Sequence, residues 1–246
     1  MPAIRAVTFD FWETLVRDSA ENLRAQRALR IQALGHALDR AGAPRTEAEV
    51  AEAHDRSAEV LRERFWSHHR DPSYAEQVRL VLDCAAPGAA ERLPRPLFEE
   101  LVESYISPVL RYPPALTAGA VEAVQALTAR GVRVGIISNT GRTPGVILRR
   151  FLEGHDLLRH FTVISYSDEV GFRKPDAEIF LRTLKLAGAE PGEAAHVGDN
   201  PLDDVTGAQG VGMRGVHYAA DGRIPAAHAD LHVTDLRALP ASLERL

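Results

Sequence analysis

The hydrophobic and polar positions of the chain change their period near residue 113. Ile4 to Phe9 is a largely apolar run that ends abruptly at Asp10, which is typical of a buried strand. From about 17 to 112, the apolar residues recur with the period of a helix. Beyond Tyr112-Pro113-Pro114, helical segments alternate with short apolar runs, which is the pattern of a parallel sheet with crossover helices.

Four helices are expected in the first, helical part of the chain. Thr46 and Glu49 have the spacing of a capping box, and this pair predicts the start of the second helix. Gly42 and Pro44 end the first helix, because neither residue type continues a helix well. The expected helices span about 22–41, 46–66, 73–84 and 95–110.

Three expected strands of the sheet end at a polar residue. In open parallel sheets, ligands bind at the carboxyl ends of the strands, so this edge is where we expect the chemistry. The three ends are Asp10 after 4–9, Ser138 after 132–137 and Asp199 after 194–198. Further strands are expected at about 161–165 and 215–218, and helices at about 117–130, 144–153, 176–188 and 202–211.

The fold class that follows is α/β, with a Rossmann-like parallel sheet core and an all-helical insertion directly after the first strand. We expect the core to comprise 1–16 and 113–246, and the insertion to comprise 17–112. A length of 246 residues is enough for such a core with a smaller second domain.

Composition narrows the classes of protein that remain. Hydrophobic residues make up 45% and charged residues 26%, as in ordinary globular domains. A formal net charge of −5 argues against a nucleic-acid-binding surface. Cys84 is the one cysteine, so no intramolecular disulfide can form and a cytoplasmic setting is expected. The expected partner is a small-molecule substrate, with neither nucleic acid nor membrane, and a homodimer is left open.

Four short fragments carry a family resemblance. They are Phe9-Asp10-Phe11-Trp12-Glu13-Thr14-Leu15, Ile136-Ile137-Ser138-Asn139-Thr140, Gly171-Phe172-Arg173-Lys174-Pro175-Asp176 and Val197-Gly198-Asp199-Asn200-Pro201-Leu202-Asp203-Asp204. In this order, they resemble the four motifs of the haloacid dehalogenase superfamily, whose members are mostly phosphatases. The resemblance covers about 1–16 and 113–246, and the insertion resembles the helical C1-type cap of that superfamily.

The residue types at these positions suit phosphoryl transfer. A carboxylate such as Asp10 can attack phosphorus, and Asp10 with Asp199 can share a Mg²⁺ ion, which prefers oxygen ligands. Ser138 and Asn139 offer hydrogen-bond donors to phosphoryl oxygens.

The family resemblance assigns two more residues. It implies that the backbone carbonyl of Trp12 is the third metal ligand and that Lys174 binds both the phosphate and the nucleophile. For Asp204, which follows Asp199 in the same fragment, we expect a hydrogen bond to a metal-bound water or to Lys174. Only two of the 29 basic residues are lysines, Lys174 and Lys185, so a lysine at 174 fits a site that needs a compact positive charge.

Trp12 departs from the family pattern. Phosphatases of the family usually carry a second Asp at this position, which protonates the leaving oxygen and then activates water. An indole side chain cannot transfer a proton, and general acid–base catalysis is typically worth 10²–10⁴-fold in rate.

The first interpretation is a Mg²⁺-dependent phosphatase that acts on a small phosphorylated metabolite through an aspartyl-phosphate at Asp10. Its proton donor would come from elsewhere, with Glu13, His54, His68 or His69 as candidates. Alternatively, the substrate would have a good leaving group, such as an acyl phosphate.

Two other interpretations stay open. A 2-haloacid dehalogenase would use Asp10 without metal, with Arg24 or Arg27 on the substrate carboxylate, and those relatives also have an aromatic residue at the position of Trp12. Asp199 argues against this, because the dehalogenases lack an acidic residue there. The third interpretation is a weakly active or non-catalytic binding protein, against which the intact acids and lysine argue.

Overall fold

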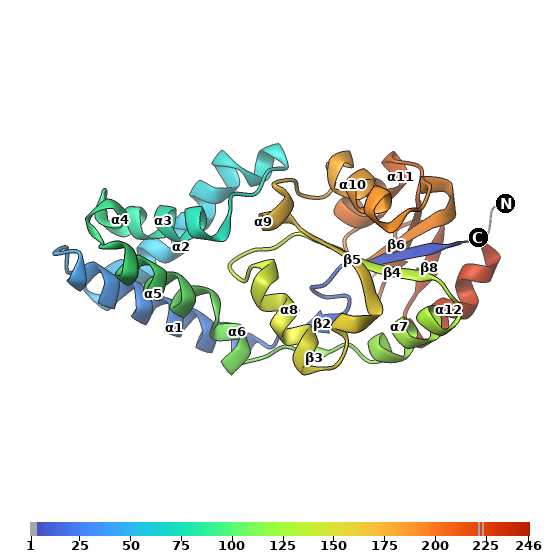
Figure 1. The fold of residues 1–246 in the computed structure, drawn as a ribbon, viewed down its shortest axis with the longest axis horizontal. Coiled ribbons are helices and arrows are strands. Elements are labelled where there is room, and N and C mark those ends of the chain that lie inside the picture. Colours follow the sequence, from blue (N-terminus) through green and yellow to red (C-terminus); the bar gives the residue numbers. More distant parts are fainter. Residues whose placement is uncertain (1–3, 221, 223) are drawn as a thin grey trace. The chain divides into compact units, whose positions relative to one another are not determined.

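The computed structural model describes residues 4–220, 222 and 224–246, and the chain forms two compact units (Figure 1). Within the described residues, the sheet unit lies in the segments Met1–Asp18, Ala115–Asn139 and Leu152–Leu246. The helical unit comprises Ser19–Pro114 and Thr140–Phe151.

The sheet unit is built on six parallel strands in the order β5-β4-β1-β6-β7-β8. The central strand β1 is buried along its whole length, which explains why its sequence lacks an alternating polar face. The strands are β1 (Ala6–Phe9), β4 (Arg133–Ser138), β5 (Phe161–Tyr166), β6 (Ala194–Gly198), β7 (Arg214–Tyr218) and β8 (Leu231–Val233). This architecture confirms the predicted α/β fold with a Rossmann-like parallel sheet.

The register of the sheet brings the motif residues to one edge. Phe9 lies opposite Ile136 of β4 and opposite Val197 of β6. Asp10 follows Phe9 directly, and its backbone N–H donates to the carbonyl of Val197 at 2.8 Å. The ends of β1, β4 and β6 therefore meet at the same edge, as the sequence predicts.

Helices cover both faces of this sheet. Figure 1 shows α10 and α11 on one face and α7 and α12 on the other. The helices that follow strands are α7 (Ala120–Ala129), α8 (Gly145–Gly154), α9 (Ser167–Val170), α10 (Ala177–Ala187), α11 (Gly207–Gly210) and α12 (Leu239–Ser242). Strand β8 and helix α12 have no counterpart in the sequence-based prediction.

The predicted helix over 202–211 is only partly correct. The chain forms a π-helical turn over Pro201–Thr206 and then the short helix α11. The side-chain oxygen of Asn200 accepts the backbone N–H groups of Leu202 and Asp203 at 2.9 and 3.1 Å. The carbonyl of Asn200 accepts the backbone N–H groups of both Asp204 and Val205, at 3.0 and 3.4 Å, and because the second bond spans five residues, a wider turn replaces a regular first turn of helix.

A short antiparallel pair joins the two places where the insertion leaves and rejoins the sheet unit. Strand β2 (Val16–Arg17) pairs with β3 (Ala115–Leu116), and the N–H of Thr117 donates to the carbonyl of Leu15. The sequence does not predict β2 and β3, because a strand of two residues is too short to show an alternation of polar and apolar positions.

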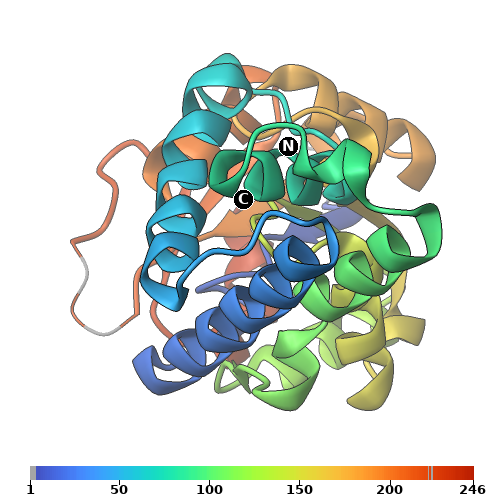
Figure 2. The same cartoon turned by 90° about the vertical axis from the view of Figure 1, so that its left-hand side faces the viewer.

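Within the described residues, the part of the helical unit from 19 to 114 forms helices and no strands. Helix α1 packs along α5, as Figure 2 shows from the side of this unit. Its helices are α1 (Ala20–Arg40), α2 (Glu47–Arg64), α3 (Tyr74–Ala85), α4 (Ala89–Arg92), α5 (Arg95–Ile106) and α6 (Pro108–Arg111). The capping box of Thr46 and Glu49 forms as predicted. Across the described ranges, none of the helices combines the length and apolar character needed to cross a membrane.

The segment that follows Asn139 also packs within the helical unit. The guanidinium of Arg142 donates to the Tyr105 hydroxyl at 2.6 Å and to the Ser57 hydroxyl at 2.9 Å. Arg30 of α1 donates to the Thr143 hydroxyl at 3.0 Å. By its contacts, 140–151 is therefore part of the helical unit, whereas the sequence-based boundaries place it with the core.

His54 of α2 is a buried base in this unit. Its Nδ1 lies 3.1 Å from a carboxylate oxygen of Asp55, and its Nε2 has no hydrogen-bond partner. Burial, helped by the positive charge of Arg142, lowers the pKa of His54 to about 4. The ring is therefore neutral at neutral pH, which argues against His54 as the missing proton donor.

This buried histidine predicts a pH-dependent stability. The unfolded chain protonates His54 near pH 6.5 and the folded chain only near pH 4, so its contribution is complete above pH 6.5 and is lost as the pH falls towards 4. Urea unfolding at about pH 7.5 and about pH 5 measures the fall in the free energy of unfolding between the two pH values. In H54F this fall should be about 2 kcal/mol smaller than in the wild type.

The exposed His36 of α1 provides the matched control for this measurement. H36Q should lose as much stability as the wild type between the two pH values. An equal loss in H54F and in the wild type would contradict the assignment.

Candidate active site

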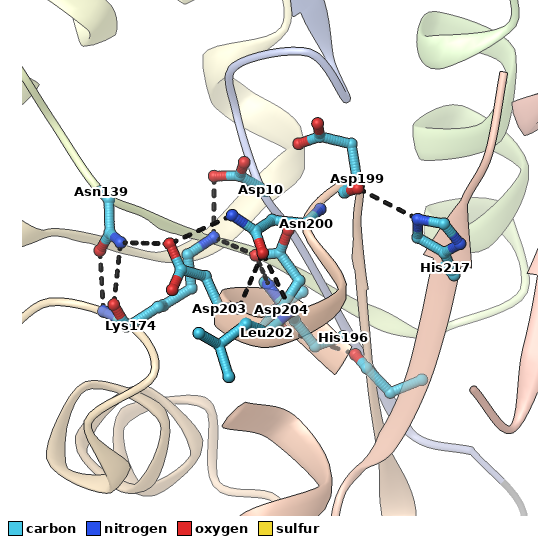
Figure 3. Close-up of polar contacts among 12 residues, drawn as sticks. Asp10, Asn139, Lys174, His196, Asp199, Asn200, Leu202, Asp203, Asp204 and His217 are labelled. Atoms are coloured by element: carbon cyan, nitrogen blue, oxygen red, sulfur yellow. Dashed lines mark hydrogen bonds and ion pairs between the residues drawn. The ribbon is translucent and has the colours of Figure 1, made fainter. Parts of the chain in front are cut away.

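A buried lysine joins two carboxylates at the carboxyl edge of the sheet. The Nζ atom of Lys174 lies 2.8 Å from Oδ1 of Asp10 and 2.5 Å from Oδ1 of Asp204 (Figure 3). The side chains of Lys174 and Asp204 are 2% and 0% exposed, and that of Asp10 is 12% exposed. Asp10 is thus the member of this triad that solvent reaches.

The two carboxylates keep the lysine charged. Burial alone would lower the pKa of Lys174, but the negative charges of Asp10 and Asp204 outweigh it and raise the pKa above its ordinary value. A full positive charge therefore stands beside the oxygen atoms of Asp10.

Asp204 is fully engaged by donors. Its Oδ1 accepts from Lys174 and lies 3.1 Å from Nε2 of His196, while its Oδ2 accepts the backbone N–H of Asn200 at 2.9 Å. Burial would raise the pKa of Asp204, but Lys174 and His196 hold it well below its usual range. A Cβ atom at Gly198 would lie 2.1 Å from this carboxyl group, so only glycine fits there.

The environment of Asp10 is set by burial. Burial raises the pKa of its carboxyl group, Lys174 opposes that rise and the charge of Asp204 adds to it. The hydroxyl of Ser138 is buried and makes no hydrogen bond of normal geometry. It lies close enough to Asp10 to lower the pKa of that carboxyl group, which favours the ionised form.

Asn139 holds the backbone of Lys174. Its Oδ1 accepts the N–H of Lys174 at 2.8 Å, and its Nδ2 donates to the carbonyl of the same residue at 3.0 Å. The side-chain amide that we expected at a phosphoryl group is thus used, in this structure, to position the lysine. A role of Asn139 in binding phosphate stays a prediction.

The backbone of Asp199 is fixed from β7. Nε2 of His217 lies 3.1 Å from the carbonyl of Asp199, and Nδ1 of His217 accepts the N–H of Ala226 at 3.0 Å. Because Nδ1 is an acceptor, Nε2 carries the proton and donates to the carbonyl.

Three carboxylates at this edge form a group of oxygen ligands. One oxygen atom each from Asp10, Asp199 and Asp204 lies within 4.8 Å of the others. Hard oxygen ligands in this number match the preference of Mg²⁺. Since both oxygens of Asp204 already accept hydrogen bonds, Asp10 and Asp199 are the residues that fit a metal.

The other residues proposed from the sequence lie as follows. The side chain of Glu13 pairs with Arg17 at 3.2 Å, and Arg27 pairs with Asp55 at 2.7 Å within the helical unit. The Trp12 ring stands edge-on to Phe11, with ring centres 5.1 Å apart. Arg24, His68 and His69 are exposed residues of the helical unit.

Sequence reasoning missed His196, His217 and Thr8. For His196 a signal was present, because a histidine inside the apolar run of β6 must find a hydrogen-bond partner when it is buried. His196 lies outside the four motif fragments and directly precedes Val197 of the last one.

Residues 4–212 match the family of haloacid dehalogenase-like hydrolases. The chain belongs to this family. The phosphoserine phosphatase of Thermus thermophilus is 39% identical over 158 residues, which are 62% of this chain and 58% of that protein. The human haloacid dehalogenase-like hydrolase domain-containing protein 3 is 37% identical over 118 residues, 48% of this chain and 44% of that protein. The chain thus spans about half the length of these two relatives.

The similar solved structures include both a dehalogenase and a phosphatase. A 2-haloacid dehalogenase from Pseudomonas syringae superposes with a TM-score of 0.73 at 26% identity, over 98% of this chain and 99% of that chain. A phosphatase of the same family from Thermococcus onnurineus gives 0.60 at 26% identity, over 97% of both chains. The family to which the chain belongs therefore includes solved structures named for both chemistries.

The buried triad predicts a large and specific loss of stability. K174M leaves Asp10 and Asp204 without their counter-charge, and removing one member of a buried ion pair typically costs about 3–5 kcal/mol. Urea unfolding at neutral pH measures this. The exposed Lys185 supplies the control, since K185M should change stability by less than about 0.5 kcal/mol. Equal effects of the two variants would contradict the triad.

Proposed function

We propose that the protein is a Mg²⁺-dependent phosphatase that hydrolyses a small phosphorylated metabolite through an aspartyl-phosphate at Asp10. The observation that carries the proposal is the pairing of Asp10 with the buried, charged Lys174 beside a second carboxylate group at Asp199. An anionic nucleophile can approach an anionic phosphoryl group only where positive charge offsets the repulsion. The phosphatase names of several relatives support the same chemistry.

In the first step, an oxygen of Asp10 forms a bond to phosphorus as the bond from phosphorus to the leaving oxygen breaks. The electron pair of that bond stays with the leaving oxygen, which takes a proton from water. Lys174 offsets charge on the transferred group, and the unpartnered hydroxyl of Ser138 is a donor for one of its oxygens. A water molecule then attacks the phosphorus, which restores Asp10 and releases orthophosphate.

A metal ion would be held by Asp10 and Asp199, with the Trp12 carbonyl as the further ligand that the family resemblance implies. When bound, Mg²⁺ supplies positive charge to the phosphoryl oxygens. On the same resemblance, the helical unit would act as a cap that selects the substrate.

Trp12 favours a substrate that needs no proton on its leaving oxygen. Glu13, the nearest acidic alternative along the chain, is half-exposed and paired with Arg17. Aryl or acyl phosphates, whose leaving oxygens are stable as anions, are therefore the substrate class that this residue suits.

A second candidate function is 2-haloacid dehalogenation. The similarity to the Pseudomonas syringae dehalogenase over almost the whole chain and the aromatic residue at position 12 favour it. The carboxyl group of Asp199 near Asp10 opposes it, because a metal-free reaction with an anionic substrate gains nothing from a second acidic residue at the site.

One assay separates the two functions. Purified protein is incubated with aryl, acyl and sugar phosphates and with 2-haloacids, each with Mg²⁺ and with a chelator. We expect phosphate release that requires Mg²⁺ and that is lost by about 10³-fold or more in D10N, since the nucleophile is removed. Metal-independent release of halide would replace the phosphatase proposal by the second function.

The position of Trp12 gives a separate prediction. W12D restores a carboxyl group where the family has its proton donor, and should raise the rate on an alkyl phosphate by about 10²-fold while changing the rate on an aryl phosphate far less. W12F is the control that keeps an aromatic ring without the acid. If W12D left both rate and substrate range unchanged, position 12 would have no part in proton transfer.

A further inference from the structure

A histidine stands behind the buried triad and contacts no reacting group in the proposed mechanism. His196 of β6 is fully buried, as is Thr8 of β1 beside it. Nδ1 of His196 lies 2.8 Å from the hydroxyl of Thr8, and Nε2 lies 3.1 Å from Oδ1 of Asp204. A continuous chain of polar contacts thus runs from Thr8 through His196, Asp204 and Lys174 to Asp10.

The partners of the ring define its tautomer. An ionised carboxylate only accepts hydrogen bonds, so Nε2 must carry the proton that points at Asp204. Burial lowers the pKa of His196, which leaves the ring neutral and Nδ1 without a proton. Nδ1 then accepts the Thr8 hydroxyl proton, since the carbonyl of Ala195 lies further from that hydroxyl, at 3.5 Å.

We propose that His196 is a positioning residue for Lys174: as the neutral Nε2–H tautomer, fixed by Thr8, it donates to Asp204 and so aims Oδ1 of that carboxylate at the lysine. The proposal rests on the proposed function, in which Lys174 offsets charge on the transferred group. Nothing in it requires His196 to gain or lose a proton during the reaction.

The geometry of Asp204 explains why its carboxylate needs a donor besides Asn200 and Lys174. The Asp204 side chain turns about two bonds, and the N–H of Asn200 makes one hydrogen bond, to Oδ2, which by itself leaves the carboxylate free to pivot. His196 fixes the orientation of Oδ1, where Lys174 also binds. Lys174 pairs with both Asp10 and Asp204, and a protonated lysine carries three N–H groups, so these two ion pairs do not use all of its donors.

A purely structural role makes a different prediction. The ring of His196 also packs edge-on against Phe180, with ring centres 5.3 Å apart. If packing were its whole role, substitutions would change stability and leave the environment of Lys174 as it is. The test must therefore report on the lysine itself.

The chain has only two lysines, which makes that report direct. Labelling lysine side chains with ¹⁵N gives two ammonium signals in an NMR spectrum, one from buried Lys174 and one from exposed Lys185. H196Q keeps a donor at the position of Nε2, whereas H196N places its amide at the position of Nδ1 and cannot reach Asp204. We expect H196N to displace the Lys174 signal and H196Q to leave it near the wild-type position, with Lys185 unchanged in both.

Activity should follow the same order. We expect kcat/KM for an aryl phosphate to fall about tenfold or more in H196N and to stay within about threefold of the wild type in H196Q, because a hydrogen bond to a charged group is lost in one variant only. The proposal would be overturned if H196N and H196Q lost kcat/KM equally, or if the ammonium signal of Lys174 stayed at its wild-type position in both variants.

A second pair of variants keeps the test independent of folding in H196N. T8V removes the hydroxyl and T8S retains it, and both leave His196 in place. Long-range ¹H–¹⁵N spectra of the imidazole distinguish its tautomers. The wild type and T8S should show the pure Nε2–H form and T8V a mixture, whereas an Nδ1–H form or a charged ring in the wild type at neutral pH would overturn the proposal.

These spectra need neither substrate nor metal, so they separate the two proposals. Absence of phosphate-ester hydrolysis would overturn the proposed function. The Lys174 and imidazole signals would still decide whether His196 positions the lysine.

Discussion

The positive charge of Lys174, enclosed between two carboxylates, is the constraint on which the site depends. An unpaired ammonium group in the protein interior would lose its proton or destabilise the fold by several kcal/mol, so its two partners must be present and correctly placed. Asp10 comes from β1, Asp204 from the turn after β6, and Lys174 from the loop before α10. The ion pairs of Lys174 therefore connect three parts of the chain that are far apart in the sequence.

The parallel sheet makes this convergence achievable. Strands β1 and β6 are neighbours, so their carboxyl ends place Asp10 and the following turn of β6 side by side. Asn139 follows β4 directly, and the nitrogen and oxygen of its side-chain amide both hydrogen-bond to the backbone of Lys174. The polar side chains of Asn139 and Asp204 thus both bond to Lys174, one to its backbone and the other to its ammonium group.

The sequence predicted most of what depends on period or on strand ends. Buried strands such as β6, the capping box at Thr46 and the meeting of Asp10 with Asp199 at one edge all follow from local pattern and parallel topology. What it could not predict depends on contacts between distant residues. His196 and Thr8 are 188 positions apart, and the backbone bond from Val205 to Asn200 that widens the turn after β6 leaves no periodic signal in the sequence.

The assignment of 140–151 to the helical unit has a consequence for how proteins of this architecture diversify. Ile147 and Leu148 of this segment are 1% and 0% exposed. A recombination event that exchanged 19–114 for the insertion of a relative would bring helices whose contacts with Arg142 and Thr143 are absent. An exchange that extends through residue 151 would keep these contacts together, whereas one that stops at 114 would leave Arg142 and Thr143 without them.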